Sequence, residues 1–246
     1  MVVTYKVQKG INKEKCDDSA LVDSLVINGD SGSVEIDNET KIMIADGVGG
    51  NAGGDEASIY VMNAINNLSF NNIGDLHLRL LEVNSNLVKY ANTVSGHELM
   101  ATTISGIFFA DNEFVMVHCG NTRIYSLQGS FLKQVTEDQT TYQWLMATGN
   151  IETAEYCNKS EIRGAFGGGT TKFSDTLVVK NIFERGTPTK ILMTSDGVHD
   201  SLDIDDIEDI IANDSLSSMG KINKLIETAV NKGSEDDCTA VLIELD

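Results

Sequence analysis

Proline, basic residues and long apolar runs are all scarce in this sequence of 246 residues. The chain has one proline and no low-complexity tract or linker, so residues 1–246 are predicted to form a single domain. No apolar run is long enough to span a membrane, and the N-terminal MVVTYKVQKG lacks the pattern of a signal peptide. The four cysteines show no CxxC spacing, which favours a reduced, cytoplasmic setting.

The shortage of basic residues makes the chain strongly acidic, with 18 Lys and Arg against 37 Asp and Glu and a formal net charge of −19. Such a surface repels phosphate backbones, so nucleic acid and anionic membranes are excluded as partners. An acidic surface mainly keeps a protein in solution, which requires no binding function. The same excess of carboxylates also suits a protein that binds divalent cations.

The order of the predicted strands and helices indicates an α+β protein. Strands are expected in short apolar or alternating segments, at residues 2–8, 20–27, 41–45, 102–110, 113–118, 123–127, 177–182, 190–194 and 239–245. Apolar residues with helical spacing occur at 57–68, 76–91, 204–211 and 219–229, and Asp203 is placed to cap the third of these helices. Two adjacent helices followed by closely spaced strands favour antiparallel sheets over βαβ units.

The segment KIMIADGVGGNAGG, residues 41–54, joins an apolar strand to a helix through a glycine-rich loop. It matches neither GxxxxGK[ST] nor GxGxxG, so a direct phosphate cradle is not indicated. Asp46, at the end of the strand, offers carboxylate oxygens, and Gly47 lets the next carbonyl turn inward. This arrangement suits a hard cation. A plain Asp-Gly turn is the alternative interpretation.

Three further acidic segments also lie where a predicted strand begins or ends. ILMTSDGVHD places Asp196 after a strand, with Asp200 one helical turn later. Asp236 precedes the last strand in SEDDCTAVLI, and Asp18 precedes the second strand in KCDDSALV. Carboxylates that come within a few ångströms of one another repel strongly unless cations neutralise them. If these segments converge, they predict a shared metal centre.

Eight segments, in order along nearly the whole chain, resemble motifs of the metal-dependent protein phosphatase 2C (PPM) family. KCDDSA is similar to N-[EQ]-D-[AS], IADGVGGNAGG to DGMGGHAAG, ATTISGIFF to a segment that begins with GTT, and HCGNTRIYSL to VGDSRxYL. QVTEDQT is similar to LTxDHS, and TGNIETAE followed by RGAFGG to G-x-[IL]-x-x-x-E and the tRaLG region. MTSDGVHD is similar to xSDGLxD, and SEDDCTAVLI to DNxTxVxV. The chain therefore resembles a bacterial-type serine/threonine phosphatase of this family.

The resemblance implies a four-layer α-β-β-α sandwich, with two antiparallel sheets flanked by helices and two Mn²⁺ or Mg²⁺ ions at one end. In the family, a water activated between the two ions hydrolyses phosphoserine and phosphothreonine in proteins. Asp46 is then expected to bridge both ions, and the carbonyl of Gly47 to bind the first. Asp196 and Asp236 are expected to bind the second ion, and Asp18 to act through water. The implied partners are phosphorylated proteins, in signalling opposite a serine/threonine kinase, and the implied state is a monomer. The region 140–171 is expected to influence substrate choice.

Three positions depart from the family pattern. Lys13 stands where the family has a phosphate-binding Arg, and a lysine neutralises phosphate without the bidentate fork of a guanidinium. Asn121 stands where the family has an Asp that, with the equivalents of Asp196 and Asp200, holds a third metal ion. A weaker third site is therefore expected here. Asp237 stands where the family usually has Asn and adds a negative charge beside the metal ligands.

Two other interpretations fit the sequence. The changes at Lys13 and Asn121 are those of a degenerate phosphatase fold that binds phosphoproteins or partners without catalysis, although the retained aspartates favour an enzyme. Cys16, Cys119 and Cys238 each lie two residues from a candidate site position. Because residues i and i+2 of a strand share a face, this spacing is also compatible with a zinc site that has thiolate ligands.

Overall fold

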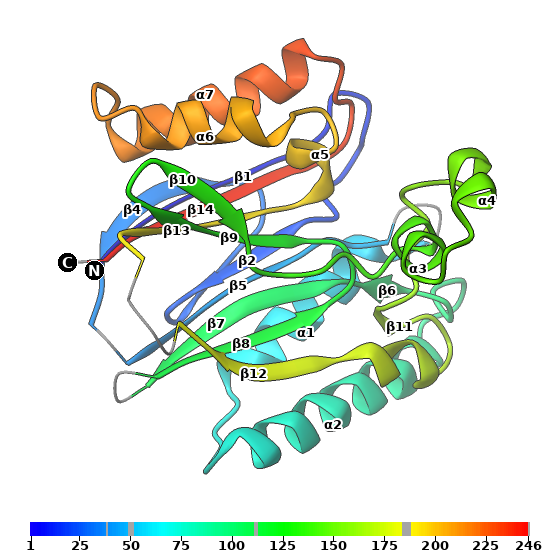
Figure 1. The fold of residues 1–246 in the computed structure, drawn as a ribbon. Helices are drawn as coiled ribbons and strands as arrows, with labels where there is room; N and C mark the ends of the chain where they lie inside the picture. Colours follow the sequence, from blue (N-terminus) through cyan, green and yellow to red (C-terminus); the bar gives the residue numbers. More distant parts are fainter. Residues whose placement is uncertain (38, 49–51, 111–112, 184–187, 246) are drawn as a thin grey trace.

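Two six-stranded antiparallel sheets pack face to face between helices (Figure 1). The computed structural model describes residues 1–37, 39–48, 52–110, 113–183 and 188–245, so Gly49, Gly50 and Asn51 of the glycine-rich loop lie outside the described residues. The four-layer α+β sandwich expected from the resemblance is confirmed. None of the helices in the described ranges is long and apolar enough to cross a membrane.

The first sheet has the strand order β10-β9-β13-β14-β1-β4. Its strands are β10 (Phe131–Gln134), β9 (Arg123–Gln128), β13 (Lys190–Thr194), β14 (Cys238–Glu244), β1 (Val2–Gln8) and β4 (Ser31–Glu35). The central pair joins the two ends of the described chain, because β1 and β14 run antiparallel from Val2↔Glu244 to Gln8↔Cys238. The segment that follows β1 therefore lies beside the segment that precedes β14.

The second sheet has the strand order β12-β8-β7-β5-β2-β3. Its strands are β12 (Val178–Ile182), β8 (Glu113–Cys119), β7 (Ile104–Ala110), β5 (Thr40–Ala45), β2 (Ser19–Val22) and β3 (Leu25–Ile27). A small sheet of β11 (Phe166–Gly167) and β6 (Ala101–Thr102) lies at one end. The pairing Ser19↔Ala45 places the start of β2 beside the end of β5.

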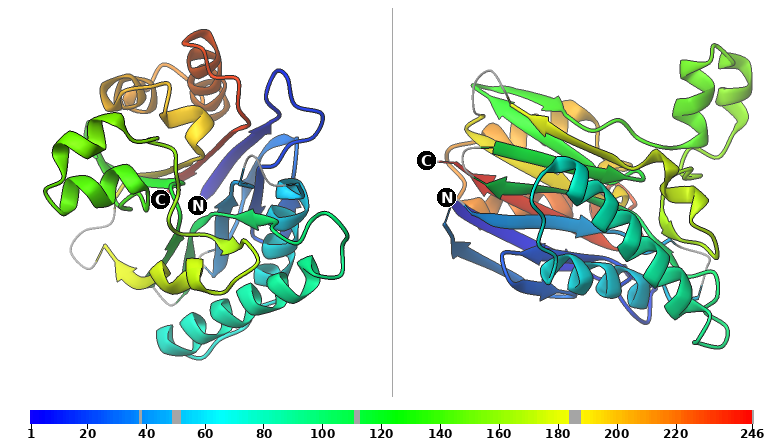
Figure 2. Two further views of the ribbon diagram at one scale, coloured as in Figure 1. Left: turned by 90° about the vertical axis from the view of Figure 1, so that its right-hand side faces the viewer. Right: turned by 90° about the horizontal axis from the view of Figure 1, so that it is seen from below.

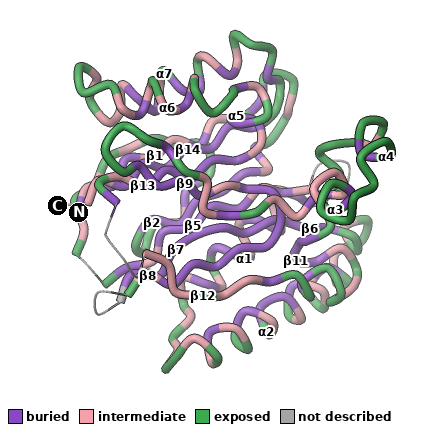
Figure 3. Tube along the Cα trace, in the orientation of Figure 1, coloured by how far each residue is buried: buried purple, intermediate pink, exposed green. Residues whose placement is uncertain are grey.

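Helices cover the outer face of each sheet, and three apolar layers hold the four layers together. The helices α1 (Gly54–Asn66) and α2 (Ile73–Ala91) cover the second sheet, and α6 (Ile204–Ala212) and α7 (Ser218–Asn231) cover the first (Figure 1). Buried residues are concentrated in the strands (Figure 3). In β5, Ile42 and Ile44 face the other sheet, while Met43 and Ala45 face α1 and α2. Because both faces of this strand are covered, its sequence is an unbroken apolar run rather than an alternation.

The helices α3 (Thr141–Ala147) and α4 (Ile151–Tyr156) project from one end of the sandwich (Figure 2). A short 3₁₀ helix, η1 (Lys172–Thr176), leads from this region into β12. At the same end, the one-turn helix α5 (Asp196–His199) follows β13 directly. The helical turn required to bring Asp196 and Asp200 close together is therefore present.

Several elements differ from the sequence expectation. The strand expected at 20–27 is two strands, because Asp23 adopts a left-handed φ of 56° and the chain turns there. The strand expected at 102–110 is divided at Thr103 into β6 and β7. Neither β4 nor α3 and α4 was predicted. The edge strand β4 consists of SGSVE, and its small polar residues give no apolar signal.

Candidate active site

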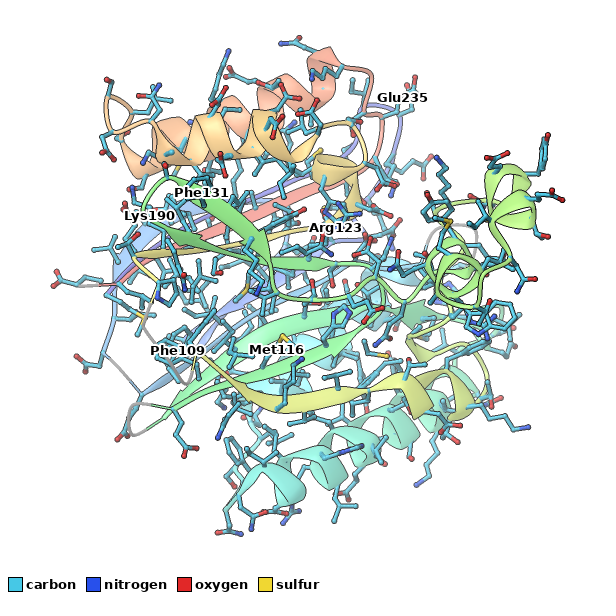
Figure 4. The ribbon with its side chains drawn as sticks, in the orientation of Figure 1. Phe109, Met116, Arg123, Phe131, Lys190 and Glu235 are labelled. Carbon is cyan, nitrogen blue, oxygen red and sulfur yellow. The ribbon has the colours of Figure 1, made fainter. Side chains whose placement is uncertain are left out.

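Strand pairing brings the predicted site residues to the end of the sandwich from which α3 and α4 project. Asp18 precedes β2 and Asp46 follows β5, so the pairing of these strand ends makes the two aspartates neighbours. Asp196 follows β13, and Asp236 lies just before β14, its partner strand. Glu235, the residue before Asp236, lies at the same end of the molecule as α5 (Figures 1 and 4). Sequence segments far apart in the chain therefore converge at one place.

A cleft of about 240 Å³ lies at this end of the sandwich. Six residues singled out in the sequence line it, namely Lys13, Asp46, Gly47, Asn121, Asp196 and Asp236. Its other walls come from Val48, Thr103 and the segment after α4, through Asn158, Ser160 and Ile162. The two remaining candidates, Asp18 and Asp200, are not among the residues that line the cleft, although Asp200 contacts Ser160, which does line it. Asp18 is buried and Asp200 is exposed.

The backbone at Asp46 is held by two threonines that precede β7. The amide of Asp46 donates to Thr103 Oγ1 at 3.1 Å, and its carbonyl accepts from the Thr103 amide at 2.8 Å and from Thr102 Oγ1 at 3.0 Å. Gly47 donates its amide to the carbonyl of Asp17 at 3.1 Å, and a Cβ at this position would lie 2.4 Å from the Gly54 carbonyl oxygen. Only glycine fits there, which explains the Asp-Gly pair in the loop.

Asp18 presents one carboxylate oxygen that has no partner. Its Oδ2 accepts from Ser195 Oγ and from Thr239 Oγ1, both at 2.7 Å. Its Oδ1 is buried without a hydrogen bond among the described residues. Burial raises the pKa of Asp18 to about 7, against the two hydroxyl donors, which lower it. A buried oxygen of this kind requires a donor or a cation.

Asp46 and Asp196 both line the cleft, and their carboxylates interact electrostatically. Loss of hydration, followed by repulsion from Asp196, raises the pKa of Asp46 well above its ordinary value. Loss of hydration also raises the pKa of Asp196, although its Oδ2 accepts a hydrogen bond from Asn121 Nδ2 at 3.0 Å. The pair is therefore short of positive charge.

Asp200 and Asp236 contact different parts of the cleft wall. Asp200 Oδ2 accepts from Ser160 Oγ at 3.2 Å, so this aspartate is tied to the segment that follows α4. Although Asp200 is exposed, partial loss of hydration, followed by repulsion from Asp196, raises its pKa. Asp236 instead forms an ion pair with Lys13 Nζ at 2.5 Å.

The donor set of the cleft fits divalent cations. Hard cations such as Mn²⁺ and Mg²⁺ bind carboxylate and carbonyl oxygens, which Asp46, Gly47, Asp196 and Asp236 supply. A cation among these side chains would provide a partner for the buried oxygen of Asp18 and would offset the raised pKa values of Asp46 and Asp196. Within the described ranges, no group of three or more Asp, Glu, His or Cys side chains is arranged as a ready-made set of metal ligands. Asp236 is turned toward Lys13 instead.

The cysteines do not form the zinc site that their spacing allowed. Cys16, Cys119 and Cys238 donate to separate backbone carbonyls, those of Asp18, Phe173 and Gly197. Burial raises the pKa of all three thiols, to about 12 for Cys119 and about 11 for Cys238, which disfavours the thiolate. These cysteines are small buried residues of the core.

Sequence reasoning missed the residues that position the aspartates. Ser195 and Thr239 orient Asp18, Thr103 fixes Asp46, and Ser160 binds Asp200. Hydroxyl residues are common in strands, so their identity alone gives no signal. Three of the four, however, lie in segments that resemble family motifs, namely ATTISGIFF, MTSDGVHD and SEDDCTAVLI. That context could have identified them.

Comparison with known proteins identifies relatives along nearly the whole chain. A serine/threonine phosphatase named stp, from Listeria welshimeri, is 31% identical over 232 residues, which cover 88% of this chain and 90% of the relative. No family model matches the sequence.

Two solved structures have the same fold. The crystal structure of a serine/threonine phosphatase from Mycobacterium tuberculosis, PstP/Ppp, is 25% identical, covers 100% of both chains and has a TM-score of 0.78. The catalytic domain of PstP in complex with two manganese ions is 24% identical, covers 99% of both chains and has a TM-score of 0.73. The two-sheet sandwich is thus shared with proteins of known structure.

Proposed function

The chain belongs to the metal-dependent protein phosphatase 2C (PPM) family of bacterial serine/threonine phosphatases, and we propose that its cleft hydrolyses phosphoserine and phosphothreonine in proteins. The observation that carries this proposal is the convergence of Asp46, Asp196 and Asp236, from three separate segments, on one cleft, where repulsion from Asp196 contributes to the raised pKa of Asp46. Two Mn²⁺ or Mg²⁺ ions bound there would offset this repulsion and would activate the attacking water.

The residues of this chain have separate tasks in that reaction. Asp46 would be a ligand of both ions, and the carbonyl of Gly47 would be a ligand of the first. Asp196 and Asp236 are ligands of the second ion. Asp18 is fixed by two hydroxyl donors through one oxygen, and its other oxygen would help to orient the attacking water.

Two further groups shape the third metal site and the phosphate site. Asp200 and Asn121 are the residues of a third, weaker metal site, because Asn121 offers a neutral oxygen where a carboxylate binds more strongly. Lys13 is the cation at the cleft that neutralises the substrate phosphate.

The proposal extends to the substrates and to the domain organisation. The substrates are phosphorylated proteins, and the enzyme acts as a cytoplasmic monomer opposite a serine/threonine kinase. Residues 1–246 form one catalytic domain in this proposal, which the continuous sheets and the pairing of β1 with β14 support. The walls of the cleft formed by Asn158, Ser160 and Ile162 support a role of the region 140–171 in substrate choice.

The test is release of phosphate from a phosphothreonine peptide with and without Mn²⁺. We expect activity that requires Mn²⁺ and that falls on the order of 100-fold or more in Asp46→Asn, because the bridging carboxylate is lost. Asp209→Asn makes the same change at an exposed position of α6 and should leave the rate unchanged. Activity that survives chelation, or that is intact in Asp46→Asn, contradicts the proposal. A protein that binds no divalent metal supports the non-catalytic binding module instead.

A further inference from the structure

The ammonium group of Lys13 is surrounded by three carboxylates. Its Nζ lies 2.5 Å from Asp236 Oδ1, 2.9 Å from Asp237 Oδ2 and 3.3 Å from Asp17 Oδ2. Lys13 Nζ donates hydrogen bonds to Asp17 and Asp237 and forms an ion pair with Asp236, so all of its close charged neighbours in this cluster are carboxylates. Burial acts against the charged form, but the hydrogen bonds to Asp236 and Asp237 raise the pKa of Lys13 above its ordinary value. This lysine therefore takes the position of a cation beside a residue assigned to the metal centre.

Asp237 holds the segment that carries Lys13. Its side chain is only 1% exposed. Its Oδ1 accepts from the amide of Gly10, and its Oδ2 accepts from the amide of Asp17, both at 2.7 Å. These two amides flank Lys13 in the sequence, so one carboxylate fixes both ends of the loop and binds the lysine as well.

An asparagine at position 237 could not make the same contacts. Its side chain has one acceptor oxygen and an NH₂ group that only donates, so the amide of Gly10 or Asp17 would lose its acceptor. A buried amide without an acceptor costs about 1–3 kcal/mol. The lysine at 13 and the aspartate at 237 are thus a matched pair in this chain.

We infer that Lys13 is a tethered cation that competes with the divalent metal for Asp236, and that Asp237 is the positioning residue that holds it there. The inference rests on the proposed function, in which Asp236 is a metal ligand. Without metal, Lys13 offsets the repulsion among the carboxylates. When a divalent ion binds Asp236, Lys13 keeps its bond to Asp237, and the released N–H becomes available to a phosphate oxygen in the cleft that Lys13 lines.

Two consequences follow from this competition. Metal binding has to precede the binding of phosphate by Lys13, because the same N–H donor serves Asp236 first and phosphate afterwards. In addition, the affinity of the protein for metal includes the free energy needed to break the Lys13–Asp236 ion pair. Any change that removes the lysine should therefore strengthen metal binding by the amount of that coupling.

The test is the affinity for Mn²⁺ alone, measured by titration calorimetry. Lys13→Met is expected to bind Mn²⁺ about tenfold more tightly than the wild type, a typical coupling between linked sites. Loss of a positive charge would strengthen metal binding even without competition, so the charge-balanced variant Lys13→Met/Asp237→Asn is measured as well and should also bind more tightly. Lys15→Met removes a lysine that pairs with Asp55 and should bind like the wild type.

The outcomes separate this inference from the proposed function. Wild-type affinity in Lys13→Met, or in the double variant, overturns the competition for Asp236. If neither the wild type nor any variant binds Mn²⁺, the proposed function itself fails.

A second measurement needs no variant. Reductive methylation of Lys13 in the wild type, read by mass spectrometry with Lys15 as the internal reference, should become severalfold faster when Mn²⁺ is added. An unchanged ratio of Lys13 to Lys15 modification overturns the inference.

Discussion

Asn121 illustrates how one neutral side chain adjusts a crowded acidic site. Its Nδ2 donates to Asp196 Oδ2 at 3.0 Å, and it is buried at the wall of the cleft. The amide stabilises the ionised form of Asp196 without adding another negative charge, whereas a carboxylate at the same position would repel it. The residue therefore favours the metal-free protein, in agreement with the weaker third metal site proposed above.

Asn121→Asp should reverse both effects. We expect the melting temperature in EDTA to fall by about 3 °C, which corresponds to about 1 kcal/mol for a chain of this size. The Mn²⁺ concentration that gives half-maximal activity should fall roughly threefold to tenfold, because a carboxylate binds the ion more strongly than an amide oxygen. Asn86→Asp, an exposed substitution on α2, serves as the control. A wild-type metal dependence in Asn121→Asp would show that this position does not contribute to the metal site.

At the scale of the elements, side-chain hydrogen bonds anchor the chain near both ends of β5. At one end, Thr102 and Thr103 hold the backbone of Asp46. At the other end, Lys41 Nζ donates to the carbonyls of Ile65 and Asn66, the last two residues of α1, and to the carbonyl of Leu68, two residues beyond the helix. A cation at the C-terminal end of a helix interacts favourably with the helix dipole and with carbonyls that have no helical partner.

Lys41→Met should lower the free energy of unfolding by about 1–2 kcal/mol, because three carbonyls at the end of α1 lose a charged donor that is only partly exposed. Lys89→Met makes the same change in the last turn of α2, where the lysine is exposed, and should cost less than about 0.5 kcal/mol. Urea denaturation of the two variants measures the difference. Equal losses in both would mean that the Lys41 contacts add nothing beyond the helix dipole.

At the scale of the whole molecule, a buried histidine links the two sheets. His118 in β8 contacts Ser105 Oγ of β7 through Nδ1 at 2.8 Å and donates from Nε2 to the carbonyl of Glu137 at 2.8 Å. Ser105 in turn contacts Thr122, just before β9 of the other sheet, at 2.6 Å. Burial lowers the pKa of His118 below its ordinary value, so the imidazole is neutral in the folded protein. Burial also lowers the pKa of His199, the last residue of the short helix α5.

This burial predicts a loss of stability in mild acid. The folded pKa of His118 lies below the unfolded value of 6.5, so the unfolded chain binds more protons as the pH falls through 6.5. Its contribution to stability is complete above pH 6.5 and should decline by about 1.4 kcal/mol per pH unit below it. The cleft carboxylates, whose pKa values are raised, give a slope of opposite sign. We therefore compare the wild type with His118→Gln, which leaves those carboxylates in place.

At pH 8 the free energy of unfolding of the wild type should exceed that of His118→Gln by about 1 kcal/mol, because glutamine keeps only one of the two hydrogen bonds. This difference should become smaller between pH 6.5 and 5. Urea denaturation across this range measures it, and a constant difference would mean that His118 does not titrate between the folded and unfolded states.

Much of the fold and of the candidate site was predictable because it depends on local patterns. Apolar runs that end in Asp-Gly mark strands that deliver carboxylates, and Asp46 and Asp196 lie at such positions in the structure. Asp203 caps α6 as its spacing predicted, through a capping box with Asp206. The turn at Asp23 was missed because a left-handed conformation in an aspartate carries no distinct local signal.

The sequence by itself determined which residue types stand at the ends of the strands, because apolar periodicity and turn residues are local properties. Only the tertiary structure decided which of those residues meet. Lys13 and Asp237 are 224 positions apart, and their ion pair exists because β1 and β14 lie side by side in the first sheet. The partner of a long charged side chain depends on the packing of whole elements. For this reason the sequence indicated a phosphate-binding lysine, whereas the structure places its ammonium group among three aspartates.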